Sequence, residues 1–457
     1  MRRILALVLA LALTLTLVPI SCFMASADQI GNFTYTVSNA GATITKYTGV
    51  GGVVDIPQYL GSYPVVAIGD NAFNGVMGLF GVNIPESVTS IGYNCFLGCT
   101  GLTEISIPDK VAKIGDTAFS GCTGLRNVTI GSGVTSIGKS AFYGCTGLTS
   151  INIPDNVITL GTSVFQNCTY LASIRIGNGV TSLPDNLFLN CTGLSTVTIG
   201  SKVSSISLSA LKSCTGLSNL IVDENNPVFS SEDCVLFNKS KNTLIQYLVS
   251  KTQSYIIPQS VQGISADAFA NCSQLTGVTI PTSVTDIGMR AFSGCTRLTE
   301  INLPDSVTSV KEKTFFGCTS LSYVNLPGIS LIGPNAFAGC TSLNNPILSL
   351  NLNIIDTCAF QNCTGLTQIV LPESVKTIGD SVFAGCTGLL EITIPNYVTT
   401  IGASAFSGCK AMTKAIIGTK VSSIGGTAFK GCISLKKINL PDSLISMGTN
   451  TFEGCTG

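Results

Sequence analysis

Histidine and tryptophan are both absent from this sequence of 457 residues. The missing imidazole removes the usual general base of hydrolases that use a serine or cysteine nucleophile. A carboxylate pair would still permit glycosidase chemistry, and no glycine loop for phosphate binding is present. We therefore expect no enzymatic activity and no cofactor, because the acidic side chains are scattered over surface positions of a repeat, as at Glu104, Asp109, Glu300, Asp305 and Glu391.

Charged residues are also scarce, at 11% of the chain, and 24 basic residues balance 24 acidic ones. Removal of Arg2 and Arg3 with a leader would leave 22 basic against 24 acidic residues. A nearly neutral chain of this kind lacks the basic surface that nucleic acids require. The sequence has no Cys-x-x-Cys pair, and without an imidazole it cannot complete a common zinc site. We expect neither nucleic acid nor metal binding.

The first 27 residues have the pattern of a secretory signal peptide. A basic start precedes an apolar run over residues 4–20, and the sequence Ala-Ser-Ala at residues 25–27 provides a cleavage site before Asp28. The alternatives are a membrane anchor, because the run nearly spans a bilayer, and a lipoprotein attached at Cys22. The small residues favour cleavage. We therefore expect a secreted or bacterial cell-surface protein with no transmembrane domain in the mature chain.

A phenylalanine that returns every 23 residues marks a repeating unit. A fixed period of roughly 20–29 residues means one short coil per repeat, which buries its apolar face only against the neighbouring coils. We therefore predict one β-rich solenoid of about 16 coils with stacked parallel strands, not several globular domains. Leu211 fills one position of the column, whose phenylalanines are Phe73, Phe96, Phe119, Phe142, Phe165, Phe188, Phe269, Phe292, Phe315, Phe337, Phe360, Phe383, Phe406, Phe429 and Phe452.

Each unit contains two short apolar patterns. The pattern Leu-x-x-Ile-x-Ile predicts a first strand and Val-x-x-Ile-Gly a second, shorter one. Prolines such as Pro108 and Pro154 end the first strand because proline lacks an amide hydrogen. An aspartate often follows, which we interpret as a local turn. The position two residues after the phenylalanine is almost always Gly or Asn, with Ser213 as the exception, and this predicts a positive φ.

Fifteen of the 19 cysteines follow the phenylalanine column by three residues. They predict a ladder of thiols at the coil spacing of ~4.8 Å. Val76 occupies the same position in the first coil, so we interpret the position as a small apolar packing site. Side chains that point the same way from stacked coils do not offer disulfide geometry. We therefore expect buried free thiols, with Cys95 and Cys99 as the one close pair to test.

The phrase IGDTAFSGCTGLRNVTIGSGVTS and its copies resemble the BspA-like leucine-rich repeats over roughly residues 68–457. This resemblance implies a secreted or surface bacterial leucine-rich-repeat protein that adheres to host matrix proteins or to other cells. It also implies how the chain is divided. Residues 28–67 resemble an N-terminal β-hairpin cap, residues 68–222 are repeats, residues 223–261 are a longer repeat with a protruding hairpin, and residues 262–457 are repeats.

The last coil is truncated, because the chain stops at Gly457 shortly after Phe452 and before another strand begins. An uncapped coil exposes unpaired strand edges and apolar surface. This predicts either end-to-end self-association at an open C-terminal coil or a further domain beyond a fragment. We favour the fragment.

The outward positions of the first strands form the expected binding face. Most carry short hydrogen-bonding side chains, and a partly apolar strip lies over the later coils. Exposed apolar patches often mark partner sites, although β-branched residues also simply suit strands. The candidate ligand-binding residues are Glu104, Asn127, Arg175, Glu300, Tyr323, Asn325, Ile347, Val370 and Ile416.

We expect this face to mediate protein–protein interaction or adhesion, with an extracellular protein or glycan as the partner. A carbohydrate-binding module is one alternative, supported by Tyr323 beside exposed amides and carboxylates. The scarcity of aromatic residues on the face argues against sugar stacking. A structural spacer of a larger surface protein, ~75 Å long, is the other alternative.

Overall fold

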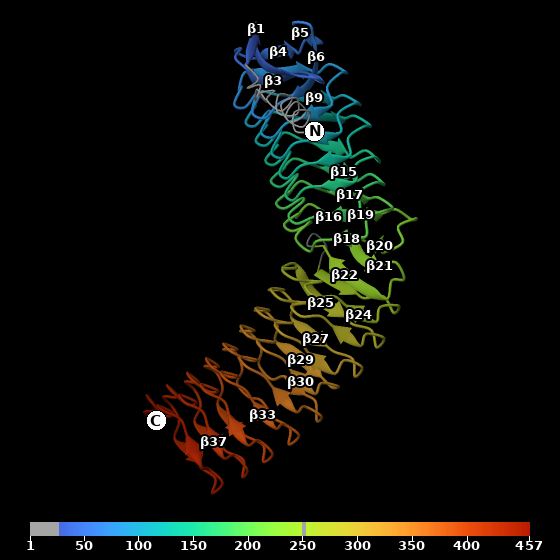
Figure 1. Cartoon of the computed structure of the whole chain (residues 1–457). Helices are drawn as coiled ribbons and strands as arrows, with labels where there is room; N and C mark the ends of the chain where they lie inside the picture. The colour runs from blue at the N-terminus through green and yellow to red at the C-terminus, as the bar shows by residue number, and fades with distance from the viewer. Residues whose placement is uncertain (1–26, 249–252) are drawn as a thin grey trace, which may run out of the picture.

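The computed structural model describes residues 27–248 and 253–457, which form one elongated stack of β-coils (Figure 1). The predicted signal peptide, residues 1–27, lies outside the described residues except for Ala27. Among the described residues, no helix has the length and apolarity that a membrane crossing requires. The predicted β-solenoid is confirmed, because successive coils pair through short parallel strands.

The first strand of each coil pairs in register with its counterpart in the next coil, as Glu104 opposite Asn127 shows. In the strand that begins at Glu104, Ile105 and Ile107 are buried and the alternate residues are exposed. These first strands are β4 (Gly52–Asp55), β7 (Leu79–Asn83), β9 (Glu104–Ile107), β11 (Asn127–Ile130), β13 (Ser150–Asn152), β15 (Ser173–Arg175), β17 (Thr196–Ile199), β19 (Asn219–Val222), β23 (Gln253–Ile256), β25 (Leu275–Thr279), β27 (Glu300–Asn302), β29 (Tyr323–Leu326), β31 (Ile347–Leu348), β34 (Glu391–Thr393), β36 (Lys414–Ile416) and β38 (Lys437–Asn439).

The second strands form a separate parallel ladder in which Ile91, Ile114 and Ile137 stack in register and are buried. They are β6 (Tyr63–Ile68), β8 (Ser90–Ile91), β10 (Lys113–Ile114), β12 (Ser136–Ile137), β14 (Thr159–Leu160), β16 (Ser182–Leu183), β18 (Ser205–Ile206), β22 (Thr243–Tyr247), β24 (Gly263–Ile264), β26 (Asp286–Ile287), β28 (Ser309–Val310), β30 (Leu331–Ile332), β32 (Ile354–Ile355), β33 (Thr377–Ile378), β35 (Thr400–Ile401), β37 (Ser423–Ile424) and β39 (Ser446–Met447). The remaining strands are β1 (Asp28–Ile30), β2 (Phe33–Ser38), β3 (Gly41–Tyr47), β5 (Tyr59–Leu60), β20 (Phe229–Glu232) and β21 (Val235–Asn238).

The phenylalanine column forms a stack of rings along the core. Consecutive ring centroids lie 4.8 to 5.8 Å apart, and rings such as Phe119 and Phe142 are nearly parallel, with 4° between their planes. The backbone of the same residues also joins neighbouring coils, since the N–H of Phe119 donates to the carbonyl of Ala141 at 2.8 Å. Full burial of such a side chain stabilises the fold by roughly 1.5–3 kcal/mol. Each coil therefore depends on its neighbours for both packing and hydrogen bonds.

The turn after each phenylalanine has the predicted positive φ, for example 71° at Gly121, 63° at Asn167 and 62° at Ser213. A second column with positive φ lies two residues before the phenylalanine, where Thr117 has φ 54° and Arg290 has φ 56°. Side chains of many types occupy this column, so the sequence gives no signal of it. Hydrogen bonds to the next coil hold the conformation, as the N–H of Thr117 donates to the carbonyl of Lys139 at 2.8 Å.

A β-hairpin covers the N-terminal end of the stack, as predicted. Strands β2 and β3 are antiparallel, and β3 then pairs in parallel with β6. Tyr47, at the end of β3, stacks on Phe73 with ring centroids 4.9 Å apart, and its N–H donates to the carbonyl of Ala72 at 2.7 Å. Tyr47 thus begins the ring column, and the hairpin satisfies the edge of the first coil.

Residues 229–247 repeat this arrangement inside the chain. Strands β21 and β22 are antiparallel, and β22 pairs in parallel with β24. Tyr247 stacks on Phe269 with centroids 5.0 Å apart, and its N–H donates to the carbonyl of Ala268 at 2.8 Å. We expected a protruding hairpin here. The hairpin instead lies within the stack, since Val235, Phe237 and Leu244 are buried, and we call this segment the internal cap.

The internal cap divides the buried side chains into two cores. One contains residues between Tyr35 and Leu236 together with Leu248, and the other contains residues between Val235 and Leu435. Among the described residues, the ring contacts of the column stop at Phe188 and resume at Tyr247. In Figure 1 the stack changes direction beside β20 to β22, drawn in green to yellow.

One buried amide joins the first core to the internal cap. Asn226 has no exposed surface, and its Nδ2 donates to the carbonyls of Gly200 and Val203 at 3.0 and 2.9 Å. Its Oδ1 accepts the N–H groups of Val228 and Phe229 at 2.9 and 2.8 Å. All four hydrogen-bonding positions of this amide are therefore satisfied.

The cysteine column places one thiol in each coil beside the phenylalanine stack. The column cysteines from Cys99 to Cys455, and Cys95, are free thiols, and nearly all are buried. Column thiols donate to the carbonyl of the preceding coil's phenylalanine, as Cys99 does to Phe73 at 3.0 Å and Cys145 to Phe119 at 3.1 Å. Cys272 instead donates to the carbonyl of Tyr247, at 3.7 Å. The cysteine therefore adds a weak intercoil hydrogen bond to the packing role that we predicted.

Burial raises the pKa of these thiols. It raises the pKa of Cys99 to about 11 and that of Cys191 to about 12. For Cys145, burial is the main cause and the neighbouring Cys168 adds to it, so that its pKa lies well above the ordinary value. The thiolate is the reactive form of cysteine. The column thiols therefore lack the ionisation that nucleophilic or metal chemistry requires at neutral pH.

Replacing Phe142 by alanine is expected to destabilise the first core and to leave the second unchanged. Removal of a fully buried ring costs about 3–5 kcal/mol, and the internal cap separates the two ring columns. Hydrogen exchange read by mass spectrometry should accelerate in peptides of the first core only. Phe360→Ala is the matched control and should give the reverse result. Faster exchange in both cores from either variant would contradict the division.

Stability is expected to fall as the pH rises above about 9. The folded pKa of a column thiol exceeds its unfolded value of about 8.5, so its contribution is complete below that value and is lost as unfolded thiols ionise. Each thiol costs about 1.4 kcal/mol per pH unit in that range. Denaturant unfolding at pH 7 and pH 10 measures the loss. A variant with Cys122, Cys145 and Cys168 changed to alanine should show a smaller loss, and equal losses would refute the explanation.

Candidate functional site

The outward side chains of the first strands form one continuous surface, which we call the strand face. Each strand contributes two such positions, as Glu104 and Ser106 do in β9. Where first strands pair in register, the same two positions of successive coils form two adjacent columns. All the predicted site residues except Val370 lie on first strands, and the register shows which of them are neighbours.

In the first core, Glu104 and Asn127 are directly opposite each other on β9 and β11, and both are exposed. Their neighbours Ser106 and Thr129 are also paired across the same strands. Short polar side chains of this kind offer hydrogen bonds but little apolar area. The strand face over β9 and β11 is therefore polar.

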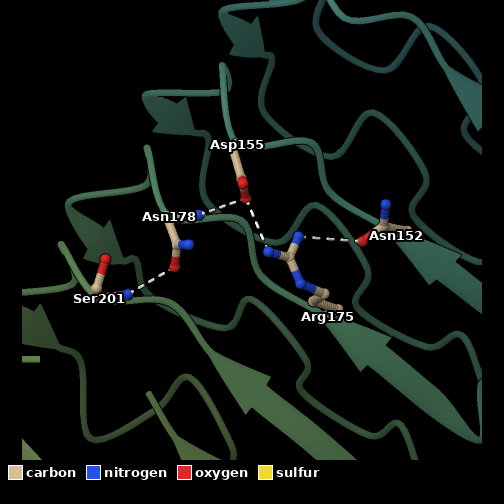
Figure 2. Close-up of polar contacts among 5 residues, drawn as sticks. All are labelled: Asn152, Asp155, Arg175, Asn178 and Ser201. Atoms are coloured by element: carbon tan, nitrogen blue, oxygen red, sulfur yellow. Dashed lines mark hydrogen bonds and ion pairs between the residues drawn. The ribbon is translucent and has the colours of Figure 1, made fainter. Parts of the chain in front are cut away.

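Arg175 is held by its own chain. Its Nη2 lies 2.9 Å from Oδ1 of Asp155, and its Nη1 donates to Asn152 at 3.4 Å (Figure 2). The N–H of Asn178 also donates to Asp155, and this hydrogen bond is the main cause that lowers the pKa of the Asp155 carboxyl. The hydrogen bond from Arg175 is the second cause. Both partners of the ion pair are about half exposed, so the pair contributes little to stability. The guanidinium of Arg175 is therefore already engaged by Asp155 and Asn152 of its own chain.

The aspartates after the strand-ending prolines act between coils. We expected them to form local turns. This is confirmed for Asp109, which lies in a turn where the N–H of Val111 donates to the carbonyl of Pro108 at 3.1 Å. Its Oδ1 also accepts the N–H and the hydroxyl of Ser132, which lies 23 residues later, at 2.7 and 3.0 Å. Asn178 extends the same pattern to the N–H of Ser201 at 2.9 Å (Figure 2). These side chains join successive coils by hydrogen bonds along the edge of the strand face.

Four of the predicted residues form one contiguous patch in the second core. Glu300 is paired with Tyr323 across β27 and β29, and Asn325 with Ile347 across β29 and β31. Tyr323 and Asn325 are two residues apart on the same strand, so all four side chains adjoin. Tyr323 is 38% exposed and Ile347 is 49% exposed. We call these four residues the Tyr323 patch.

The predicted apolar strip beyond the patch is interrupted. Val370 is 77% exposed but lies outside any strand, between β31 and β34. Ile416 is paired with Thr393 and Asn439, so polar side chains flank it on both sides. Ile347 and Val370 are therefore the predicted strip residues with the most exposed apolar side chains.

Several exposed aromatic side chains were missed in the sequence, among them Tyr397. Tyr397 is 55% exposed and lies in the turn between β34 and β35. Nζ of Lys420 lies 4.3 Å from the centroid of the Tyr397 ring. The two residues are 23 positions apart, which is one repeat period. This spacing in the sequence would have predicted that they lie side by side in neighbouring coils.

The described residues contain no group of three or more His, Cys, Asp or Glu side chains that could hold a metal ion. The carboxylates of the strand face, such as Glu104 and Glu300, belong to coils on either side of the internal cap. At the usual strand spacing they are separated by on the order of 30 Å or more, so the pair cannot act on one bond. The site offers binding surface and fixed hydrogen-bonding groups.

The sequence matches the profile of the BspA type leucine rich repeat region (6 copies) over residues 62–169, 114–243, 245–367 and 330–457. A search of the curated proteins found no match. Several solved structures are similar. A leucine rich cell surface protein from Faecalibacterium prausnitzii is 28% identical, with 91% of this chain and 94% of that chain covered and a TM-score of 0.49.

Two further structures share the fold at lower identity. A leucine-rich repeat protein from Eubacterium ventriosum is 21% identical, with 94% and 95% coverage of the two chains and a TM-score of 0.51. The pneumococcal vaccine antigen PcpA is 21% identical, with 86% and 93% coverage and a TM-score of 0.55. Because the profile matches nearly every coil, the chain belongs to the BspA type leucine-rich repeat family.

Proposed function

We propose that this chain is a secreted or cell-surface bacterial protein that binds an extracellular macromolecule through its strand face. The BspA type family and the leader-like N-terminus support this location. The absence of histidine and the raised pKa of the buried thiols support a binding role without catalysis. Adhesion to a protein on another surface is the finer form of the proposal.

The Tyr323 patch is the observation that carries the proposal. It combines an aromatic ring, an aliphatic side chain, an amide and a carboxylate on neighbouring parallel strands. Tyrosine is enriched among residues that contribute most to protein interfaces. The patch lies on strands whose backbone is fixed by the stack, so binding costs little conformational entropy. A protein partner would therefore meet a preorganised anchor surrounded by short polar side chains.

Two other functions predict different behaviour of the same face. A structural spacer would bind nothing through the strand face. A carbohydrate-binding module would bind glycans there, and Tyr323 beside Glu300 and Asn325 is the arrangement that favours it. The polar surface at Glu104 and Asn127 favours neither the spacer nor the carbohydrate-binding module. The strand face in the second core is therefore the region that distinguishes these functions.

A double variant, Tyr323→Ala with Ile347→Ser, is expected to lose most of the affinity for the protein partner. Truncation of two central contact residues typically costs 2 kcal/mol or more, or roughly a 30-fold loss. The mature chain would first be screened against arrayed matrix proteins and glycans, and the hit would then be measured by surface plasmon resonance. Thermal unfolding should be nearly unchanged, because both side chains are substantially exposed.

The matched control for this experiment is Glu104→Ala with Asn127→Ala, on the same face in the first core. This control should keep the affinity of the unmodified chain. Equal binding by both double variants would exclude the Tyr323 patch. A glycan hit lost in the Tyr323 variant would favour the carbohydrate module, and a screen without any hit would favour the spacer.

A further inference from the structure

A pocket of about 440 Å³ lies beside the strand face, lined by Asn353, Glu373, Ser374, Lys376 and Tyr397. These residues come from three consecutive coils, at the bend between the first and second strands. Asn353 directly precedes β32, Lys376 directly precedes β33, and Tyr397 lies shortly before β35. The volume is within the usual range of small-ligand pockets, roughly 300–1,000 Å³.

Tyr397 gives the pocket an aromatic wall. Lys420, whose ammonium lies 4.3 Å from the ring centroid, comes from the coil on the C-terminal side of Tyr397. The other lining residues come from coils on its N-terminal side. The lysine thus holds the ring from one side by a cation–π contact, while the other side borders the pocket. A ring fixed in this way is a ready surface for a flat apolar face of a ligand.

The polar groups of the pocket are held in place by their own chain. One oxygen of Glu373 accepts the N–H of Asn396 at 3.2 Å, and Nδ2 of Asn353 donates to the carbonyl of Asn351 at 2.9 Å. The hydroxyl of Ser374 donates to the carbonyl of Leu352 at 2.7 Å. The second Glu373 oxygen and the Asn353 amide oxygen are left as acceptors for ligand hydroxyls.

Lys376 is the free cation of this pocket. Among residues 27–248 and 253–457, no carboxylate forms an ion pair with it. Glu373 is the one carboxylate among the lining residues, against the ammonium of Lys376 in the lining and that of Lys420 on the Tyr397 ring. The local charge is therefore positive, and it favours a ligand that carries an anionic group.

We propose that this pocket binds one unit of an acidic saccharide, a pyranose that carries a carboxylate or a sulfate group. The C–H face of the sugar ring packs on Tyr397, its hydroxyls donate to Glu373 and Asn353, and its anionic group pairs with Lys376. An apolar ligand is disfavoured because it would desolvate Glu373 and Lys376 without replacing their hydrogen bonds. The pocket is separate from the Tyr323 patch and does not depend on the function proposed for it.

Calorimetric titration of the mature chain with two tetrasaccharides tests this proposal. One probe alternates glucuronic acid and N-acetylglucosamine, and the other is the neutral N-acetylglucosamine tetramer. We expect the acidic probe to bind about fivefold more tightly at low salt, as one exposed ion pair allows. Added salt should reduce this preference, because it screens the exposed charges. Equal affinities, or no binding of either probe, would overturn the proposal.

Three single variants separate the contributions. Tyr397→Ala should weaken both probes about tenfold through loss of the ring contact, and Lys376→Gln should remove only the preference for the acidic probe. Tyr170→Ala is the matched control, because this tyrosine is 71% exposed and lies outside the pocket. It should change neither affinity. Thermal unfolding of each variant checks that the fold is retained.

Two further measurements identify the ligand class and the surface. A tetramer of glutamate tests for an acidic peptide, and tighter binding of this peptide than of the acidic sugar would overturn the saccharide assignment. Tyr323→Ala should leave sugar binding unchanged, since it alters only the strand face. Loss of sugar binding in Tyr323→Ala, with binding retained in Tyr397→Ala, would place the sugar on the strand face and refute the pocket.

Discussion

The in-register stacking of coils is the constraint on which this structure depends. A single coil has no core of its own. Its phenylalanine ring packs against the rings of the coils before and after it, and its strands and turn amides hydrogen-bond to those coils. A change of period would displace every column at once. Both ends of a stack therefore require something to replace the missing neighbour, and Tyr47 and Tyr247 provide this by continuing the ring column into a hairpin.

The same constraint decides where variation is tolerated. Inward positions accept only side chains that fit the column, and cysteine fits because its thiol is small and also reaches the carbonyl of the preceding phenylalanine. Polar columns such as Asp109 with Ser132 fix the edges between coils. Outward strand positions such as Glu104 and exposed bend residues such as Lys376 are left without such a role. Specificity in this chain must therefore be located at such positions, on a backbone that is already rigid.

The internal cap gives the chain two cores within one stack. The first carries a mostly polar strand face with Arg175 engaged by Asp155. The second carries the Tyr323 patch, Val370 and the pocket beside Tyr397. The first also exposes aromatic side chains, such as Phe80 and Tyr170. The change of direction at β20 to β22 separates the two surfaces (Figure 1). This arrangement allows one core to recognise a partner while the other extends the molecule.

The sequence alone determined the features that depend on period and on local preference. It predicted the solenoid, the two strands of each coil and the positive φ at Gly121 and Asn167, because these follow from repeated apolar spacing and from residues that favour that conformation. Only the tertiary structure decided the packed internal hairpin, the positive φ of Thr117 and Arg290, and the contacts of Arg175 and Tyr397. Those features arise from register between coils and from the direction of individual side chains, which a one-dimensional pattern does not specify.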